Sequence, residues 1–206
     1  ISSMALALRR IRLNYPYSLA NHVSNKRTFY TESETEQNIT LLSYLPPRYA
    51  TVPANTSSER SSKTNASNEQ IINEPPTPAY ESLLAYINST KHLFNEVNWS
   101  TAFRVLAQYR RNDRTTGFTS STITSHPTMS QITSDFKNRL TSYTDTGIEW
   151  LGVRQYCSIY HSSTILSLPT SSILYSGICS NVDTVAEEGG TQSITKVMEG
   201  CVRGGG

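Results

Sequence analysis

The sequence predicts an all-α protein: a short α-solenoid of about three helix-hairpin repeats, preceded by an extended N-terminal tail. Three observations lead to this prediction. Apolar residues recur at helical spacing through 80–206. Turns divide this part of the chain into pairs of helices, whose second members can be aligned with one another. By contrast, 51–79 is rich in Ser, Thr, Asn and Pro, and alone it cannot bury enough surface to offset the entropy of ordering.

These observations divide the chain into three parts. We expect a presequence-like basic segment over 1–31, an extended, disordered linker over 32–79 and a helical-repeat domain over 80–206. The linker begins with a short apolar patch, ITLLSYLPPRY, which a Pro-Pro pair ends. The three cysteines are an odd number and widely spaced, which fits a reducing compartment better than a disulfide framework.

The segment 1–31 has the composition of an organellar transit peptide. It holds five basic residues and no acidic residue, and it lacks the uninterrupted apolar stretch of a secretory signal. The residues RTFY at 27–30 are typical of a mitochondrial processing site, with an arginine three positions before a cut after Phe29. We therefore expect a mitochondrial location. A plastid address is the main alternative. The structural alternative is a disordered basic tail, which could contact nucleic acid.

The first helix pair is predicted from Tyr80 onward. Its first helix carries an apolar stripe of Tyr80, Leu83, Leu84, Ile87 and Phe94. A break at 95–97 leads to Asn98, which we interpret as the N-cap of a second helix with the stripe Trp99, Ala102, Phe103 and Leu106. Two helices joined by a tight turn form a hairpin. The Ser/Thr-rich segment TTGFTSSTITS has no sustained period, so we predict a loop there.

Two further pairs follow this loop. The clearest amphipathic helix carries Met129, Ile132, Phe136, Leu140 and Tyr143 and ends before Gly147. Its partner is the segment VRQYCSIYHSSTI. After Pro169, one helix is predicted from the stripe Ile173, Leu174, Ile178, Val182 and Val185. A Gly-Gly pair at 189–190 ends it, and TQSITKVMEGCV forms the last helix.

The second helices of these pairs align. Placing Arg154 on Gln192 also places Ile159 on Val197, an offset of 38 residues. Placing Ala102 on Ile159 gives an offset of 57, a comparable unit plus the Ser/Thr-rich insertion. Two helices repeated at roughly 35–45 residues are typical of an α-solenoid, in which each unit buries its faces against its neighbours.

The residues 94–109, FNEVNWSTAFRVLAQY, resemble a phrase of octotricopeptide-repeat, RAP-domain and FAST-kinase-like proteins, "fN-x-vN-x-sTAl-x-rLAk". The segments VRQYCSIYHSS and TQSITKVMEGCVRGG resemble later helices of the same families, so the resemblance covers 80–206. It implies a helical-repeat RNA binder of mitochondria or plastids. Some members of these families are structural subunits of mitochondrial ribosomes.

Seven basic residues are candidates for RNA contact: Arg104, Arg110, Arg111, Arg114, Lys137, Arg139 and Arg154. Guanidinium groups match phosphate oxygens in shape and charge. The structural alternative is that they complement helix C-termini or lie on solvated loops. Residues 80–206 hold ten basic and ten acidic side chains, so the domain as a whole lacks the charge of a strong nucleic-acid binder.

No catalytic residue, metal site or cofactor is predicted. Cys157 and His161 stand four residues apart and could form half of a metal site, but neither Cys179 nor Cys201 supplies a close second pair. The sequence has no P-loop, G-x-S-x-G or Rossmann fingerprint. Trp99 and Trp150 lie on apolar stripes, so we expect them to pack between helices rather than stack on bases.

These observations together predict a non-enzymatic accessory subunit of the mitochondrial ribosome. We expect it to dock on ribosomal RNA and on neighbouring proteins of a large multi-subunit assembly. We expect no membrane span, because no stretch approaches the roughly 18 apolar residues that one requires. Two alternatives are a lineage-specific accessory subunit of a respiratory-chain complex and a free organellar RNA maturation or stability factor. A basic concave face would favour the RNA-binding functions.

Overall fold

The computed structural model describes residues 31–46, 79–143 and 147–204, which form helices and turns and contain no strand. The all-α prediction is therefore confirmed. The predicted presequence, except Thr31, and the predicted linker from 47 to 78 lie outside the described residues. Among the helices of the described ranges, none is both long enough and apolar enough to cross a membrane.

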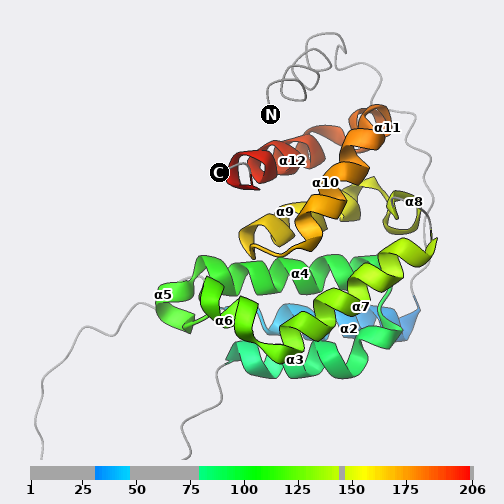
Figure 1. The fold of residues 1–206 in the computed structure, drawn as a ribbon. Helices are drawn as coiled ribbons and strands as arrows, with labels where there is room; N and C mark the ends of the chain where they lie inside the picture. The colour runs from blue at the N-terminus through cyan, green and yellow to red at the C-terminus, as the bar shows by residue number, and fades with distance from the viewer. Residues whose placement is uncertain (1–30, 47–78, 144–146, 205–206) are drawn as a thin grey trace, which may run out of the picture.

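The chain order of the helices is as follows (Figure 1). The elements are α2 (Glu32–Ser43), α3 (Ala79–Thr90), the 3-10 helix η2 (Lys91–Leu93), α4 (Glu96–Arg111), α5 (Asp113–Thr116), α6 (Ser120–Ser125), α7 (Pro127–Tyr143), α8 (Ile148–Leu151), α9 (Val153–Ile165), α10 (Thr170–Ser180), α11 (Val182–Glu188) and α12 (Gly190–Gly204).

Four helices, α2, α4, α9 and α12, lie in one layer and run in the same direction (Figure 1). The returning helices α3, α7 and α10 run the opposite way. Two hydrogen bonds fix the register of α2 on α4. Asn98 Nδ2 donates to the carbonyl of Glu34 at 3.0 Å, and the Tyr109 hydroxyl donates to the carbonyl of Tyr44 at 2.6 Å. Because both partners advance together along their helices, α2 and α4 are parallel.

The helices α9 and α12 approach closely because small residues line their contact. A Cβ atom added to Gly200 would lie 2.5 Å from Cε1 of Tyr160. Gly189, which joins α11 to α12, also lies beside Val153 on α9, since an added Cβ would come within 3.1 Å of its Cγ1. Real side chains do not pack at 2.5 Å, so the position of α12 against Tyr160 requires glycine at 200.

An aromatic cluster forms the centre of the core between α4 and α7. Trp99 is 1% exposed, and its ring centroid lies 5.2 Å from that of Phe136 and 6.2 Å from that of Phe103. Trp150 is half-buried and stacks on Tyr143 with centroids 5.1 Å apart. Both tryptophans therefore pack on other side chains, as predicted.

The structure differs from the extended linker predicted for 32–79, because this segment begins with a helix. Thr31 and Glu34 form a capping box at the start of α2, and Leu41 is fully buried against the core. Leu41 of the apolar patch that the sequence placed in the linker is therefore part of the core, and its helix α2 packs on α4. Contact with α4 offsets the entropy of ordering, which the polar composition of α2 alone could not.

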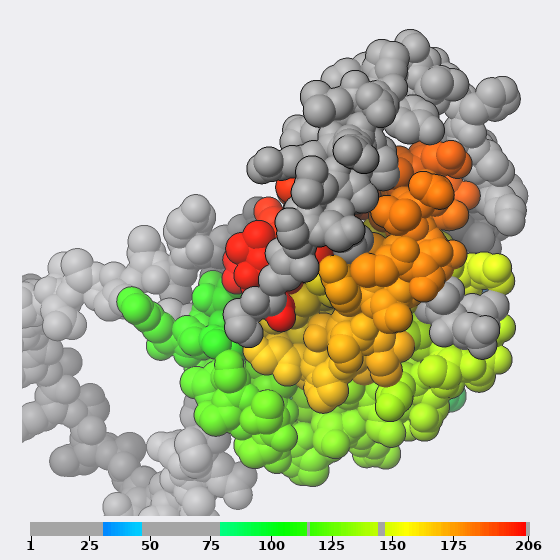
Figure 2. Space-filling view, turned by 45° about the horizontal axis from the view of Figure 1, so that its top comes forward, coloured from blue at the N-terminus to red at the C-terminus, as the bar shows by residue number. Residues whose placement is uncertain are grey.

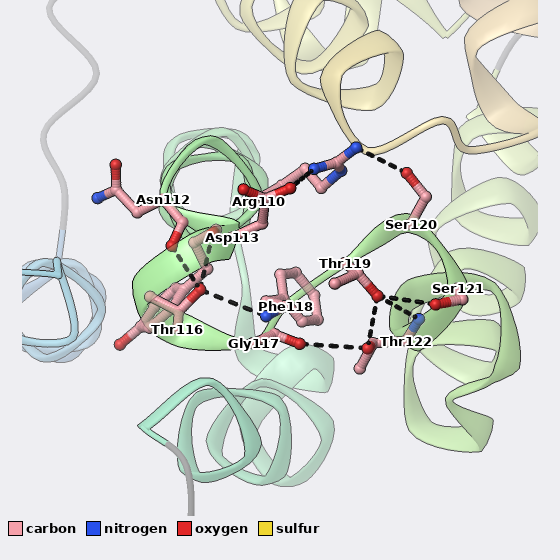
Figure 3. Close-up of polar contacts among 11 residues, drawn as sticks. Arg110, Asn112, Asp113, Thr116, Gly117, Phe118, Thr119, Ser120, Ser121 and Thr122 are labelled. Carbon is pink, nitrogen blue, oxygen red and sulfur yellow. Dashed lines mark hydrogen bonds and ion pairs between the residues drawn. The ribbon is translucent and has the colours of Figure 1, made fainter.

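The connection from α4 to α7 also differs from the prediction, since the expected loop contains α6. The Thr119 hydroxyl caps this helix by accepting a hydrogen bond from the N–H of Thr122 at 3.3 Å (Figure 3). Phe118 and Ile123 are buried on either side of the cap. A Ser/Thr-rich sequence thus forms a short helix because its few apolar residues reach the core.

Two smaller predictions are corrected as well. The N-cap of α4 is Asn95 rather than Asn98, which occupies the third helical position and completes a capping box. The helix predicted between Pro169 and Gly189 is divided into α10 and α11 at Asn181. The side chain of Asn181 donates to the carbonyl of Gly177 at 2.9 Å, and this local bond competes with continuation of the helix.

Candidate nucleic-acid interface

Five basic side chains gather over α4, α9 and α12, and we call them the basic patch: Arg104, Arg111, Arg154, Lys196 and Arg203. Arg104 and Arg111 are seven residues apart on α4, as are Lys196 and Arg203 on α12. Seven residues make two helical turns, so each pair lies on one face about 10.5 Å apart. Figure 2 shows the red end of α12 next to the green segment that ends α4, on one face of the molecule.

Charged side chains on α4 and α12 both shift the pKa of His161, which lies on the intervening helix α9. Burial lowers the pKa of His161 on α9, and Arg111, Arg203 and Lys196 lower it further, whereas Glu199 raises it. The pKa of Lys196 is lowered by burial and then by Arg104, while Cys157 opposes this change. Cations that are 92 residues apart in the sequence, at 104 and 196, therefore lie close enough to repel each other.

The cations of the basic patch form no ion pairs within the described part of the chain. All five except the half-buried Lys196 are exposed. The acid beside the patch is Glu199. Its Oε2 lies 3.0 Å from His161 Nε2, without hydrogen-bond alignment. A concentration of unpaired positive charge attracts anions and favours an anionic ligand.

A groove of about 390 Å³ opens beside Arg154 and Lys196, two members of the patch. Its remaining wall is formed by residues 189–193, the turn after α11 and the start of α12. The first N–H groups of an α-helix have no intrahelical acceptor, and the first turn of α12 holds no acidic residue. Two cations and the positive end of a helix dipole therefore border the same space, which suits an oxyanion.

Two of the arginines predicted to contact RNA instead have intramolecular partners. Arg110 pairs with Asp113, and its Nη2 lies 2.8 Å from the hydroxyl of Ser120, so it fixes the connection after α4 (Figure 3). The guanidinium carbon of Arg139 lies 5.3 Å from the centre of the Trp150 ring. Both side chains already stabilise the fold, by an ion pair and by a cation–π contact respectively.

The other predicted residues divide between the patch and separate surfaces. The structure brings Arg104, Arg111 and Arg154 together in the basic patch. Arg114 on α5 and Lys137 on the returning helix α7 are exposed, and neither is among the charges that act on His161 or Lys196. The sequence did not single out Lys196 and Arg203. Their seven-residue spacing, the same as that of Arg104 and Arg111, is the signal that could have found them.

The Cys157 and His161 pair has no metal-site geometry. Cys157 is fully buried, and burial is the main cause that raises the pKa of its thiol to about 12. A thiol with that pKa is a poor source of the thiolate that binds metals. Within the described ranges, no group of three or more His, Cys, Asp or Glu side chains is arranged to hold a metal ion.

Comparisons with protein-family models, curated proteins and solved structures gave no match to this chain. The resemblance of 94–109 to organellar RNA binders therefore stays a prediction. In the structure, the two asparagines of that phrase have structural contacts. Asn95 and Asn98 exchange hydrogen bonds at 2.9 and 3.2 Å, and Asn98 also binds α2. They fix the start of α4 and its contact with the preceding parallel helix.

Proposed function

We propose that this chain is a non-enzymatic, RNA-contacting subunit of the mitochondrial ribosome, docked through its basic patch. The observation that carries the proposal is the patch itself. Five cations from three helices lie together with no ion partner in the described part of the chain. Phosphates of RNA would supply the missing counter-charge. The choice of the ribosome rests on the transit-peptide composition of 1–31 and on the family resemblance.

A repeat scaffold fits this role, and several contacts support a short α-solenoid. The parallel helices α4, α9 and α12 are the second helices of the three predicted pairs. Contacts of Val153 with Gly189 and of Tyr160 with Gly200 correspond to offsets of 36 and 40 residues, on either side of the predicted 38. On this interpretation, α2 is the second helix of a preceding unit. Stacked units would hold the cations of separate helices in fixed positions.

The chemistry of the patch favours contact with the RNA backbone over contact with bases. Proteins that hold single strands stack bases on exposed aromatic rings. The aromatic residues of α9 nearest the patch, Tyr156 and Tyr160, are buried. Contacts to phosphates position a protein without reading sequence. We therefore propose a docking role on structured RNA rather than sequence-specific recognition.

The first test compares two double variants with equal loss of charge. Arg104→Gln with Arg111→Gln alters the patch, whereas Arg114→Gln with Lys137→Gln alters exposed cations outside it. We expect the patch variant to weaken binding to a structured ribosomal RNA fragment and to reduce the slope of log K against log salt by about two, roughly one for each cation. Equal effects of the two variants would remove the patch from the proposal.

The second test places the chain in its assembly. Detergent-solubilised mitochondria are sedimented with and without RNase, following the wild-type chain and the patch variant alongside ribosomal RNA and respiratory complexes. Co-migration with ribosomal RNA that RNase and the patch variant both reduce supports the proposal. Migration with a respiratory complex that is indifferent to RNase contradicts it. Slow migration with free RNA would identify a maturation or stability factor instead.

The respiratory-complex alternative has one observation in its favour. The outer helices of the parallel layer, α2 and α12, carry exposed apolar side chains: Ile39 is 62% exposed and Val202 is 84% exposed. Exposed apolar residues at the ends of a helical stack suit a protein neighbour. A ribosomal subunit also has protein neighbours, so the RNase arm of the sedimentation experiment decides between the two assemblies.

A further inference from the structure

We infer that the groove at the start of α12 binds a phosphate group. The inference rests on the proposed function for the source of the phosphate, an RNA strand that lies along the basic patch. It goes further by assigning a discrete site within that surface, formed by the turn at 189–193 together with Arg154 and Lys196. Three independent features of the groove support it.

The first feature is the helix terminus. The helix α12 is 15 residues long, so its dipole is developed, and its N-terminal end borders the groove. Thr191 and Gln192 lie in the first turn, where backbone N–H groups have no intrahelical acceptor. No side chain in the described residues accepts from these two N–H groups. An oxyanion in the groove would accept from them.

The second feature is the hydroxyl of Ser193. This residue is only 3% exposed, and it lines the groove. Within the described part of the chain its hydroxyl has no hydrogen-bond partner. The residue is buried but its oxygen keeps access to the groove, so the hydroxyl is available to a ligand there. A phosphate oxygen would provide the acceptor.

The third feature is charge. Arg154 and Lys196 border the groove and have no ion pair in the described residues, and Arg104 repels Lys196. A bound phosphate would offset that repulsion. Glu187 and Glu188 end α11 nearby, but both are exposed and neither lines the groove. The balance of charge around the groove is therefore positive.

The direct test is titration of the full chain with inorganic phosphate, followed by NMR of backbone amides. We expect saturable shifts at Thr191, Gln192 and Ser193. Arg154→Gln should weaken phosphate binding about tenfold, because a charge-assisted hydrogen bond is lost, and Ser193→Ala about threefold. Arg203→Gln removes the same charge at the far end of the patch and is the matched control. Absence of saturable shifts, or equal effects of Arg154→Gln and Arg203→Gln, would overturn the inference.

A second experiment identifies the source of the phosphate and separates this inference from the proposed function. RNA with a 5′-phosphate is compared with the same RNA bearing a 5′-hydroxyl. Tighter binding of the phosphorylated strand, lost in Ser193→Ala, supports a terminal phosphate. Equal binding that Ser193→Ala still weakens supports a backbone phosphate. RNA binding that is insensitive to Ser193→Ala overturns the inference alone, whereas amide shifts with phosphate but no RNA binding overturn only the proposed function.

Discussion

The helices α4 and α12 belong to the same parallel layer but are held in it by opposite means. α4 is fixed by large side chains, above all Trp99, whose ring packs on Phe103 and Phe136. The residues that α12 buries, Ser193, Val197 and Gly200, are small, so it is held by close approach to α9. A helix that buries little side-chain volume keeps most of its surface free. α12 can therefore carry the half-buried Lys196 and the exposed Arg203, so charge lies where packing demands least.

Among the tests of this comparison, Trp99→Ala should cause the largest loss of stability. Removing a fully buried aromatic side chain leaves a cavity beside Phe136, so we expect the free energy of unfolding to fall by about 3–5 kcal/mol. Urea unfolding monitored by circular dichroism measures the change. Trp150→Ala is the control, since Trp150 is half-buried and should cost clearly less. Equal losses would mean that α4 does not depend on the volume of its central aromatic residue.

The converse change on α12 is Gly200→Ala. Helix propensity alone favours alanine by about 1 kcal/mol, but the added Cβ would lie 2.5 Å from Tyr160. We therefore expect a net loss of about 1–3 kcal/mol, because α9 and α12 must move apart. The control is Gly204→Ala on the same helix, whose Cβ would meet Thr164 at an ordinary 3.7 Å and should be neutral. A stabilised Gly200→Ala variant would contradict the close approach.

A smaller effect is expected at the start of α4. Asn98→Ala removes one member of the capping box and the hydrogen bond to the carbonyl of Glu34, so it should cost about 1–2 kcal/mol. Asn95→Ala removes the cap and a contact with the Glu34 side chain, but it keeps the hydrogen bond from Asn98 to the carbonyl of Glu34. Hydrogen exchange of α2 amides distinguishes the two, since exchange should accelerate more in Asn98→Ala. The same acceleration in both variants would assign the effect to the cap.

The contrast between α4 and α12 also explains what the sequence could predict. The helices α7 and α9 were located correctly, because large apolar residues recur on one face and Gly147 and Pro169 mark their boundaries. The helices α2 and α6 were missed, because Leu41 and Ile123 are single anchors in polar sequence. The helix α2 is stabilised by contact with α4, which is distant in the sequence, and α6 by contact with α7. No local pattern in the sequence reports either contact.

Only part of the candidate interface could be predicted, because membership in it also depends on contacts between distant segments. Arg104 and Arg111 were predicted as part of a cluster at the end of the first hairpin, and Arg154 as an extension of a basic strip. The sequence did not distinguish them from Arg110, whose partner Ser120 lies ten residues on. Lys196 joins the interface only because α12 lies beside α9. Which cations have ion partners and which lie together are both properties of the tertiary structure. A shared seven-residue spacing on successive parallel helices is the pattern that would have indicated the patch.

The smallest expected effect is a pH dependence of stability that comes from His161. This residue lies on α9, between α4 and α12, and charges on both of these helices shift its pKa. Its pKa in the folded state lies below the ordinary value of about 6.5, first because of burial and then because of Arg111. As pH falls below 6.5, the unfolded state takes up the proton more readily, so the free energy of unfolding falls until the folded pKa is passed. His161→Gln should remove this component between pH 7.5 and 5. Glu199→Gln should make the loss of stability at low pH steeper, because Glu199 raises the pKa of His161. Identical pH profiles for the wild type and both variants would show that the charges of the patch do not affect His161.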